Sequence, residues 1–240
     1  MRSTAGQIGV VSWLGRYPVK SMRGEQLATA EIDRQGIVGD RQWAVFTPDG
    51  GVGSGKSSRR FRRVEGLLDY RATLNGPGGV APLIESPTGQ RFSADDPQAS
   101  ELLSTALHRP LRLGQEAGVR HHDESGLHLV TTAALRTLSE LLGETVEVAR
   151  FRPNLVLETP GSGFVEDDWA GRELRLGADV AVRLGTGMPR CVMVDMAQGA
   201  LDADGRILKL LGRERQLLFG IKVEVLRGGI VRQGDPAVLV

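Results

Sequence analysis

Apolar and polar residues alternate in many short runs along the chain, and residues that favour turns separate most of these runs. Such alternation predicts β-strands, because successive side chains of a strand point to opposite faces of a sheet. The short spacing of the first three runs favours a barrel or a sandwich over repeated βαβ units. The predicted strands cover residues 7–15, 26–34, 42–47, 71–74, 83–86, 90–92, 111–113, 127–130, 145–151, 155–158, 173–176, 179–184, 192–194, 221–226 and 237–240, with a turn-rich segment at 75–79.

Wider spacing of apolar residues predicts four helices. The second helix opens with Asp95, Asp96 and Pro97, so that an aspartate stands at the expected cap and the proline lies in the first turn. Thr131 and Thr132 precede the third helix, and Gly143 ends it. The fold class is therefore α+β, mainly β. The predicted helices cover residues 59–68, 95–107, 133–142 and 206–220.

The composition is that of an ordinary globular protein, with 40% hydrophobic and 25% charged residues among 240. A net charge of +1 gives no general affinity for polyanions, so nucleic acid is not expected as a partner. No apolar run approaches the roughly 20 residues of a membrane-spanning helix, and the first nine residues lack the apolar core of a signal peptide. We therefore expect a cytoplasmic protein without membrane contact. A boundary near residue 115 predicts two domains, 1–115 and 116–240.

Cys191 is the only cysteine of the chain. A disulfide within the chain and any site made only of cysteines are thereby excluded. Pro189 interrupts regular structure just before it, and Arg190 places a cation beside it. From this segment alone, Cys191 is either an inert core thiol or a nucleophile or metal ligand.

A phosphate-binding loop is a second candidate, because residues 50–57 match the pattern G-x-x-x-x-G-K-[ST]. Its short flanking strands and turns argue against it, since a nucleotidase of this kind needs a parallel sheet. Five basic residues in the same region are either a solvated face or an anion site. They are Lys56, Arg59, Arg60, Arg62 and Arg63.

Basic residues also recur where predicted strands meet turns. Each alone is more often a surface charge, but together they could converge on one mouth and bind an anion beside the thiol. His121 and His122 lie in a polar segment without a spaced partner, so metal binding by them is not expected. The junction residues are Lys20 with Ser21, Arg41, Arg152 and Arg190.

Several segments, in order along nearly the whole chain, resemble the MOSC-domain proteins that carry an N-terminal β-barrel domain. This family includes the amidoxime-reducing component and the C-terminal domain of molybdenum cofactor sulfurase. The resemblance implies a β-barrel MOSC core and an N-terminal β-rich subdomain. The matching segments are 17–21, 39–41, 127–131, 151–154, 164–167 with Trp169, 190–191 with Asp195, and 234–236.

The resemblance further implies a molybdenum cofactor, Mo-molybdopterin, which carries a pterin dithiolene and a phosphate. It implies that Cys191 is the metal ligand and the catalytic residue. Many relatives have serine where this chain has Pro189, so one contact there is lost. The residues implied to contact the pterin and its phosphate are Lys20, Ser21, Arg41, Thr131, Arg152, Asn154 and Arg190.

Three functions stay open at this point. The first is a molybdenum-dependent oxidoreductase that reduces N-hydroxylated or N-oxygenated small molecules. Its electrons would come from a separate protein of the ferredoxin or flavoprotein type. The second is a carrier of the cofactor or a sulfur-transfer module without turnover, which needs the same pocket. The third and most remote is the nucleotidase.

Overall fold

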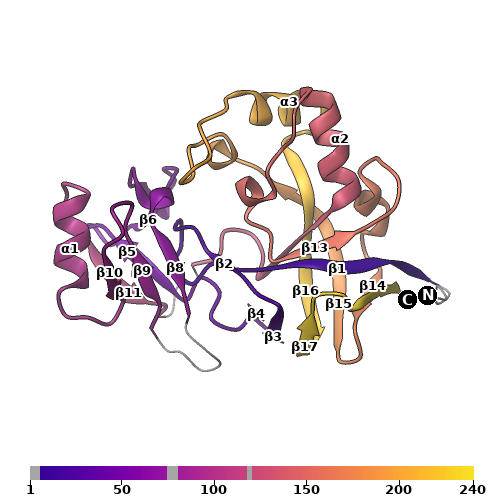
Figure 1. Cartoon of the computed structure of the whole chain (residues 1–240), viewed down its shortest axis with the longest axis horizontal. Helices are drawn as coiled ribbons and strands as arrows, with labels where there is room; N and C mark the ends of the chain where they lie inside the picture. The colour runs from indigo at the N-terminus through magenta and orange to yellow at the C-terminus, as the bar shows by residue number, and fades with distance from the viewer. Residues whose placement is uncertain (1–5, 75–80, 118–120) are drawn as a thin grey trace.

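Seven strands form a closed β-barrel in one half of the molecule (Figure 1). The computed structural model describes residues 6–74, 81–117 and 121–240. Pairing of β1 with β13 closes the barrel, so neither of these strands leaves a free edge there. In spatial order the strands are β13 (Leu155–Glu158), β12 (Leu127–Thr131), β16 (Leu218–Arg227), β15 (Val180–Pro189), β14 (Glu173–Leu176), β18 (Pro236–Leu239) and β1 (Gln7–Arg16).

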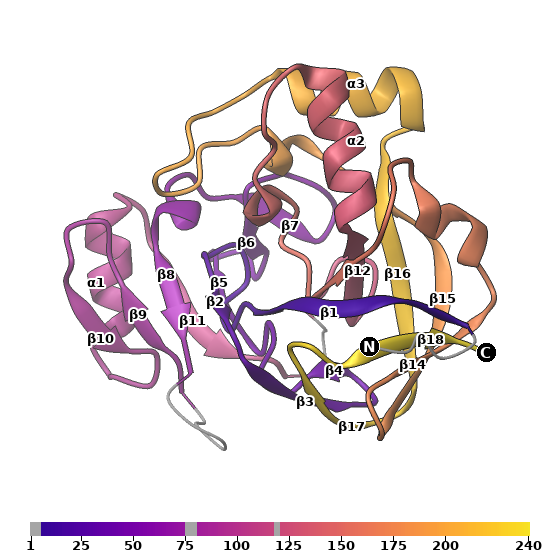
Figure 2. The same cartoon turned by 45° about the vertical axis from the view of Figure 1, so that its right-hand side comes forward.

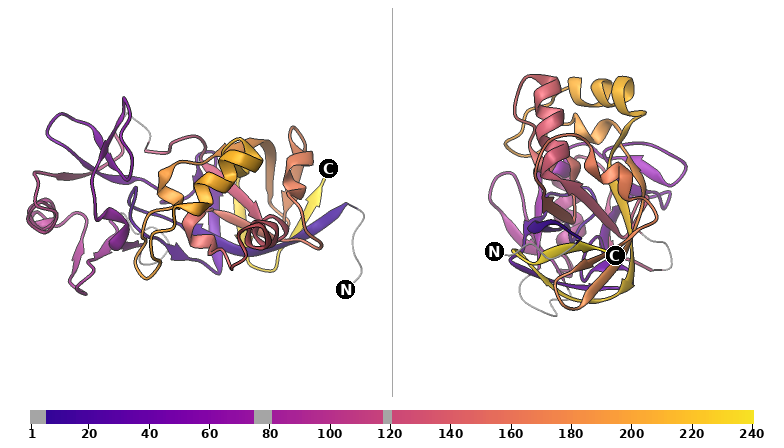
Figure 3. Two further views of the ribbon diagram at one scale, coloured as in Figure 1. Left: turned by 90° about the horizontal axis from the view of Figure 1, so that it is seen from above. Right: turned by 90° about the vertical axis from the view of Figure 1, so that its right-hand side faces the viewer.

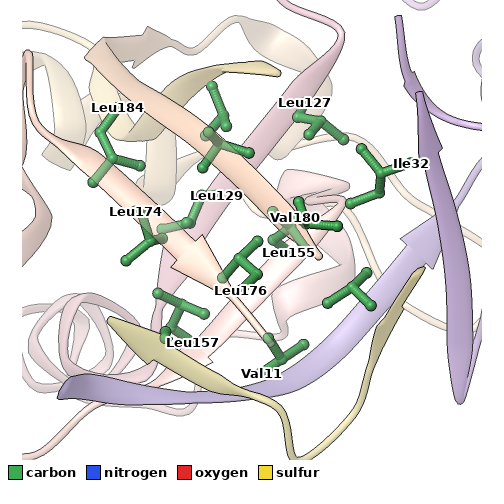
Figure 4. Packing of buried hydrophobic residues seen from close by; sticks show 14 of the residues in the cluster. Val11, Ile32, Leu127, Leu129, Leu155, Leu157, Leu174, Leu176, Val180 and Leu184 are labelled. Atoms are coloured by element: carbon green, nitrogen blue, oxygen red, sulfur yellow. The ribbon is translucent and has the colours of Figure 1, made fainter. Parts of the chain in front are cut away.

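Alternating leucine and valine side chains from these strands fill the barrel (Figure 4). Leu129, Leu155 and Leu174 are fully buried there. All five residues of β12 are buried, and Val130 packs in a second apolar cluster with residues of the helices α2 (Thr132–Leu142) and α3 (Arg206–Arg215), which lie at one end of the barrel (Figure 1). The barrel and these helices form a rigid frame for the loops at their ends.

Three smaller sheets make up the remainder of the strand structure in the described residues. Figure 3 shows the N-terminal subdomain lying beside the barrel along the longest axis, and Figure 2 shows β1 running from one to the other. The smaller sheets are β11 (Arg112–Gln115), β5 (Trp43–Phe46), β6 (Val52–Ser54) and β7 (Phe61–Arg63); β10 (Arg91–Ser93), β9 (Leu83–Glu85) and β8 (Arg71–Thr73); and β17 (Gly229–Arg232), β3 (Thr29–Asp33) and β4 (Gly36–Ile37). A short strand, β2 (Glu25–Gln26), pairs antiparallel with the end of β1 and belongs to the sheet of the barrel.

The strands β1, β3 and β4 therefore belong structurally with the second half of the chain, whereas Val19 and Met22, between β1 and β3, pack in the core of the N-terminal subdomain. β1 lies between β18 and β13, and β3 pairs with β17. The remainder of the N-terminal half has its own apolar core, built around Val45, Ile84 and Leu103, on which α1 (Ala99–Ala106) packs. The mainly β fold with a barrel is confirmed, whereas the division at residue 115 stays a prediction.

The third predicted helix is confirmed together with both of its ends. The Thr131 hydroxyl accepts a hydrogen bond from the Ala134 amide (3.1 Å), which satisfies one of the free donors of the first turn of α2. Gly143 ends the helix in the left-handed conformation, φ +76°. No helix of the described residues is long and apolar enough to cross a membrane.

Three predicted elements are wrong where local pattern and tertiary packing disagree. Residues 59–68 form β7 and a short 3₁₀ helix, η1 (Leu67–Asp69), because Gly66 takes φ +81° and β7 pairs with β6. The segments predicted as strands at 145–151 and 192–194 contain 3₁₀ helices instead. These are η2 (Val148–Phe151) and η4 (Val192–Val194).

Two further helices differ at their ends from the prediction. The helix predicted over 95–107 begins at Ala99, because Asp96 forms a turn with the Gln98 amide instead of capping the helix. The helix predicted over 206–220 ends at Arg215, since the next two residues are left-handed and lead into β16. The turn-rich segment at 75–79 lies outside the described residues.

The segment that matches a phosphate-binding loop is not one. Val52–Ser54 is strand β6, which pairs with β5 antiparallel and with β7 parallel. Such a loop works by wrapping backbone amides around phosphates at the start of a helix. Here the chain continues from Lys56 into β7, so the nucleotidase hypothesis is wrong.

Gly220 of β16 packs closely against β12. Its φ is +68°, and a methyl group in its place would lie 2.5 Å from the ring nitrogen Nε2 of His128 and from the carbonyl oxygen of Leu129. Gly143 is equally left-handed, with no atom within 4 Å of such a methyl group. An alanine at Gly143 would therefore suffer backbone strain alone, whereas an alanine at Gly220 would suffer the same strain and a steric clash as well.

We predict that Gly143→Ala lowers the free energy of unfolding by about 1 kcal/mol, whereas Gly220→Ala lowers it by at least about 2 kcal/mol. Urea unfolding of both variants measures the difference. Equal losses in the two variants would contradict the close packing of Gly220 against β12.

Candidate functional site

Cys191 lies at a turn between the barrel and the α3 region. β15 ends at Pro189, and the Arg190 amide donates to the Leu217 carbonyl oxygen (2.7 Å). Cys191 itself is extended and precedes η4, with an intermediate exposure. The thiol is therefore held at the end of a barrel strand and not within the core.

A cleft of about 160 Å³ opens at this thiol, between the barrel and the N-terminal subdomain. It brings together six segments of the chain, at residues 20–21, 41, 56, 122–128, 150–154 and 188–194. All but one of the predicted site residues line it: Lys20, Ser21, Arg41, Arg152, Asn154, Arg190 and Cys191. The convergence of basic strand–turn junctions on one mouth is thus what the structure shows, and their role as cofactor contacts stays a prediction.

A buried carboxylate, Asp40, organises one wall of the cleft. It accepts hydrogen bonds from the Tyr17 backbone amide (2.7 Å) and from the Asn154 side-chain amide (3.1 Å). It also pairs with Arg41 and with His122 Nε2 (3.2 Å). Burial alone would raise the pKa of Asp40, but Arg41 and His122 hold it below its usual value. Asp40 is therefore ionised and joins the two halves of the site.

Asn154 has no free hydrogen-bonding capacity toward the cleft. Its amide nitrogen donates to the carbonyl oxygen of Gly15 (3.0 Å) as well as to Asp40, and its oxygen accepts from the His128 amide (3.2 Å). Asn154 thus positions the strands around the cleft.

Arg152 lines the cleft and has a hydrogen-bond donor that is unused among the described residues. It sits in the left-handed conformation, φ +50°, and its guanidinium lies over the Tyr17 ring at 4.4 Å. One terminal nitrogen, Nη1, donates to the Met22 carbonyl oxygen (2.5 Å), whereas the other, Nη2, is buried without a partner among the described residues. Burial lowers the pKa of Arg152 to about 10, so it remains a cation at neutral pH. A buried, unpaired guanidinium nitrogen beside a cleft is a donor that awaits an acceptor.

Two lysines on the opposite side share one carboxylate. Lys20 Nζ pairs with Asp123, and Lys56 Nζ lies 2.9 Å from the second oxygen of the same group. Burial lowers the pKa of Lys20 to about 8, while the two lysines together bring the pKa of Asp123 to about 2 against the effect of its own burial. The Phe61 ring lies beneath both ammonium groups, at 4.3 and 5.3 Å.

Arg190 serves a different purpose from its neighbours. Its guanidinium donates to the carbonyl oxygens of Phe219 (3.2 Å) and Phe151 (3.1 Å) and contacts the His128 ring (2.9 Å to Nε2). Burial and Arg190 keep the pKa of His128 well below its usual value, so this imidazole is neutral. Arg190 therefore ties the turn before Cys191 to η2 and to β16.

Thr131 does not line the cleft, which corrects its place among the predicted contacts. It is fully buried, its hydroxyl caps α2, and it donates to Glu166 Oε2 (2.7 Å). Both of its hydrogen-bonding functions are thereby used inside the protein.

The basic segment 56–63 divides between two roles. Lys56 faces the cleft, whereas Arg62 pairs with Asp49 (2.6 Å) and Arg63 with Glu65 (3.0 Å) on the surface. The five residues therefore do not line one cleft, since Arg59, Arg60 and Arg62 line a separate pocket, and their role as an anion site stays a prediction.

The sequence reasoning missed Asp123 and the partners of the two histidines. His122 pairs with Asp40, and His121 is buried with its ring nitrogen Nδ1 2.9 Å from the Arg41 carbonyl oxygen. These partners are about 80 residues away, so no local spacing could reveal them. No group of three or more metal-binding side chains of His, Cys, Asp or Glu occurs within the described ranges.

Comparison with known proteins now adds to this geometry. Residues 116–238 match the model of the MOSC domain, and residues 8–102 match that of the MOSC N-terminal beta barrel domain. The chain belongs to the MOSC-domain family.

Curated relatives extend the match over almost the whole chain. A mitochondrial amidoxime reducing component 2 from Rattus norvegicus is 27% identical over 286 residues, which cover 96% of this chain and 83% of the relative. A mitochondrial amidoxime-reducing component 1 from Xenopus laevis is also 27% identical, with coverages of 96% and 82%. Among solved structures, the YuaD protein from Bacillus subtilis aligns with a TM-score of 0.49 at 13% identity, over 96% of this chain and 94% of that one.

The cleft fits a cofactor of the kind that the family resemblance implies. A pterin dithiolene with a phosphate needs hydrogen-bond donors, positive charge and one protein ligand for its metal. The unpartnered nitrogen of Arg152, the lysine pair and the single thiol of Cys191 meet these three needs.

Glu166, which accepts the hydrogen bond from Thr131, is a buried carboxyl group beside α2. Its side chain is 1% exposed, and Oε1 has no partner within the described part of the chain. Burial raises the pKa of Glu166 from 4.5 to about 7. Between these two values the folded protein binds a proton that the unfolded chain has released, so stability falls as the pH rises.

We predict that the free energy of unfolding decreases by up to about 3 kcal/mol from pH 4.5 to pH 7.5 through this group. Glu166→Gln, which is neutral throughout, should remove most of that decrease in urea unfolding at a series of pH values. The control Glu173→Gln changes an exposed carboxylate and should keep it. An unchanged pH slope in Glu166→Gln would refute the buried, protonated carboxyl.

Proposed function

We propose that the protein binds a molybdenum cofactor in the cleft and reduces N-hydroxylated or N-oxygenated small molecules. The observation that carries this proposal is the position of the chain's single thiol, Cys191, in the same cleft as the buried, unpartnered guanidinium nitrogen of Arg152. The names of the relatives, which are amidoxime-reducing components, support the substrate class.

In this proposal Cys191 is the metal ligand and the catalytic residue. A thiolate is a soft ligand suited to a redox-active metal, and Cys191 is held at a strand end with a route to solvent. When bound, the molybdenum cofactor supplies two-electron removal of oxygen from the substrate.

The cations have separate tasks. Arg152, Lys20 and Lys56 bind the phosphate and pterin oxygens, since Arg152 has a guanidinium nitrogen without a partner among the described residues and the two lysines share a carboxylate that can be exchanged. Arg41 and Arg190 are held by Asp40 and by backbone carbonyl oxygens, so they orient the walls and contribute charge. Ser21, left-handed at φ +62°, lines the cleft, and its hydroxyl lies 3.5 Å from the hydroxyl of the buried Ser54.

Electrons come from a separate ferredoxin- or flavoprotein-type carrier in this proposal, because one cysteine cannot hold an iron–sulfur cluster. We also propose a cytoplasmic location. The relatives are named mitochondrial, so cell fractionation is the appropriate test.

One prediction of the proposed function concerns Cys191→Ala. In a host that makes the cofactor, the wild-type protein should retain about one molybdenum and one pterin per chain. The variant should lose the metal and all reduction of an N-hydroxylated amidine by a chemical reductant. The neighbouring, exposed Val192→Ala should retain both. Metal analysis and turnover measure the result, and full activity of Cys191→Ala would sink the assignment.

The same experiment separates an enzyme from a carrier. Wild-type protein that holds the cofactor but shows no turnover with the chemical reductant would favour a carrier or sulfur-transfer module. Absence of both molybdenum and pterin would overturn the proposal altogether.

The second prediction concerns the unpaired guanidinium. Arg152→Gln should lower the pterin content by roughly tenfold, because it removes a charge-assisted hydrogen bond, and Arg152→Lys should give an intermediate value. Arg112→Gln, in the N-terminal subdomain and outside the cleft, is the matched control. Equal pterin contents in Arg152→Gln and Arg112→Gln, with both folded by circular dichroism, would contradict the role of Arg152.

A further inference from the structure

The two cleft lysines, Lys20 and Lys56, are already paired with an anion of the chain itself, the carboxylate of Asp123. Lys20 follows β1, Lys56 follows β6, and Asp123 precedes β12, so three separate segments meet in one ionic contact. Asp123 therefore occupies the place beside both ammonium groups that a phosphate would otherwise take.

The three side chains differ in how freely they can move. Lys20 is 7% exposed and Lys56 is 25% exposed, whereas the carboxylate of Asp123 is 28% exposed and lies in an irregular segment. Phe61 lies under both lysines and holds their ammonium groups by cation–π contact whether or not Asp123 is present. Asp123 can leave Lys20, because its carboxylate is partly exposed and can turn into water, whereas Lys20 is almost fully buried.

The energetic reason for such a carboxylate follows from burial. A lysine ammonium that is almost fully buried without an anion is costly, so Asp123 stabilises the site when no ligand is bound. A phosphate dianion carries more charge and more acceptor oxygens than one carboxylate, so it can replace Asp123 in the cleft that Arg152 also lines.

We propose that Asp123 is an internal counter-ion that a phosphate-bearing ligand displaces from Lys20 and Lys56. This inference rests on the proposed function for the identity of the natural ligand, but not for the exchange itself. Asp123 protects the unloaded site, lowers its affinity for stray anions and leaves the lysines when the ligand enters.

Binding of inorganic pyrophosphate to cofactor-free protein tests the exchange by isothermal titration calorimetry. Asp123→Asn should bind pyrophosphate about tenfold more tightly than the wild-type protein, because the competing charge is gone. Glu124→Gln removes an equal charge from the lining of the same cleft. Without a lysine contact within hydrogen-bond distance in the described structure, it should change the affinity by less than about threefold.

A second variant guards against an indirect effect. Lys56→Met in the Asp123→Asn background should return the affinity to the wild-type level or below, because one of the two released cations is gone. An affinity of Asp123→Asn within twofold of wild type, or no binding by either protein, would overturn the inference. So would an equal gain in Glu124→Gln.

The outcome is independent of molybdenum. Tighter pyrophosphate binding by Asp123→Asn in a protein that never acquires molybdenum would uphold the counter-ion while refuting the proposed function. If the wild-type protein acquires molybdenum but the cofactor-free Asp123→Asn variant binds pyrophosphate with the wild-type affinity, the proposed function is upheld and the counter-ion is refuted.

Discussion

The buried carboxylate of Asp40 is the interaction on which the site depends. It lies between the two halves of the molecule and bonds to the Tyr17 amide, to Asn154, to Arg41 and to His122. Removal of one partner from such a buried ionic network is costly, since the remaining charges lose their compensation. The network therefore fixes the N-terminal subdomain against the barrel, and the cleft exists where the two meet.

The cleft that results is strongly basic. Six lysine and arginine side chains line it against two carboxylates, in a protein whose net charge is only +1. Some of these cations are held by internal acceptors, whereas one nitrogen of Arg152 has no partner in the described part of the chain and two lysines share one carboxylate. This imbalance favours an anionic ligand at a place where the chain also exposes its single thiol.

Much of the fold and of the site could be predicted from sequence. Strand alternation gave the barrel strands, and the Thr131 and Gly143 caps gave α2, because these signals are local. The helix expected over 59–68 failed, since pairing of β7 with β6 overrides its apolar spacing. Basic residues at turns pointed to the cleft, but Asp123 and the partner of His122 come from remote segments and leave no local signal. Thr131 was misassigned because a cap and a ligand contact use the same hydroxyl.

The position of Cys191 in this cleft is the central claim, and the single cysteine makes it directly measurable. Alkylation by iodoacetamide, followed by intact-mass spectrometry, compares protein with and without the molybdenum cofactor. We expect one label per chain in cofactor-free protein and at least about tenfold slower labelling in loaded protein, because a ligand thiolate is not free to react. Equal rates in the two forms would contradict the assignment of Cys191 as the metal ligand.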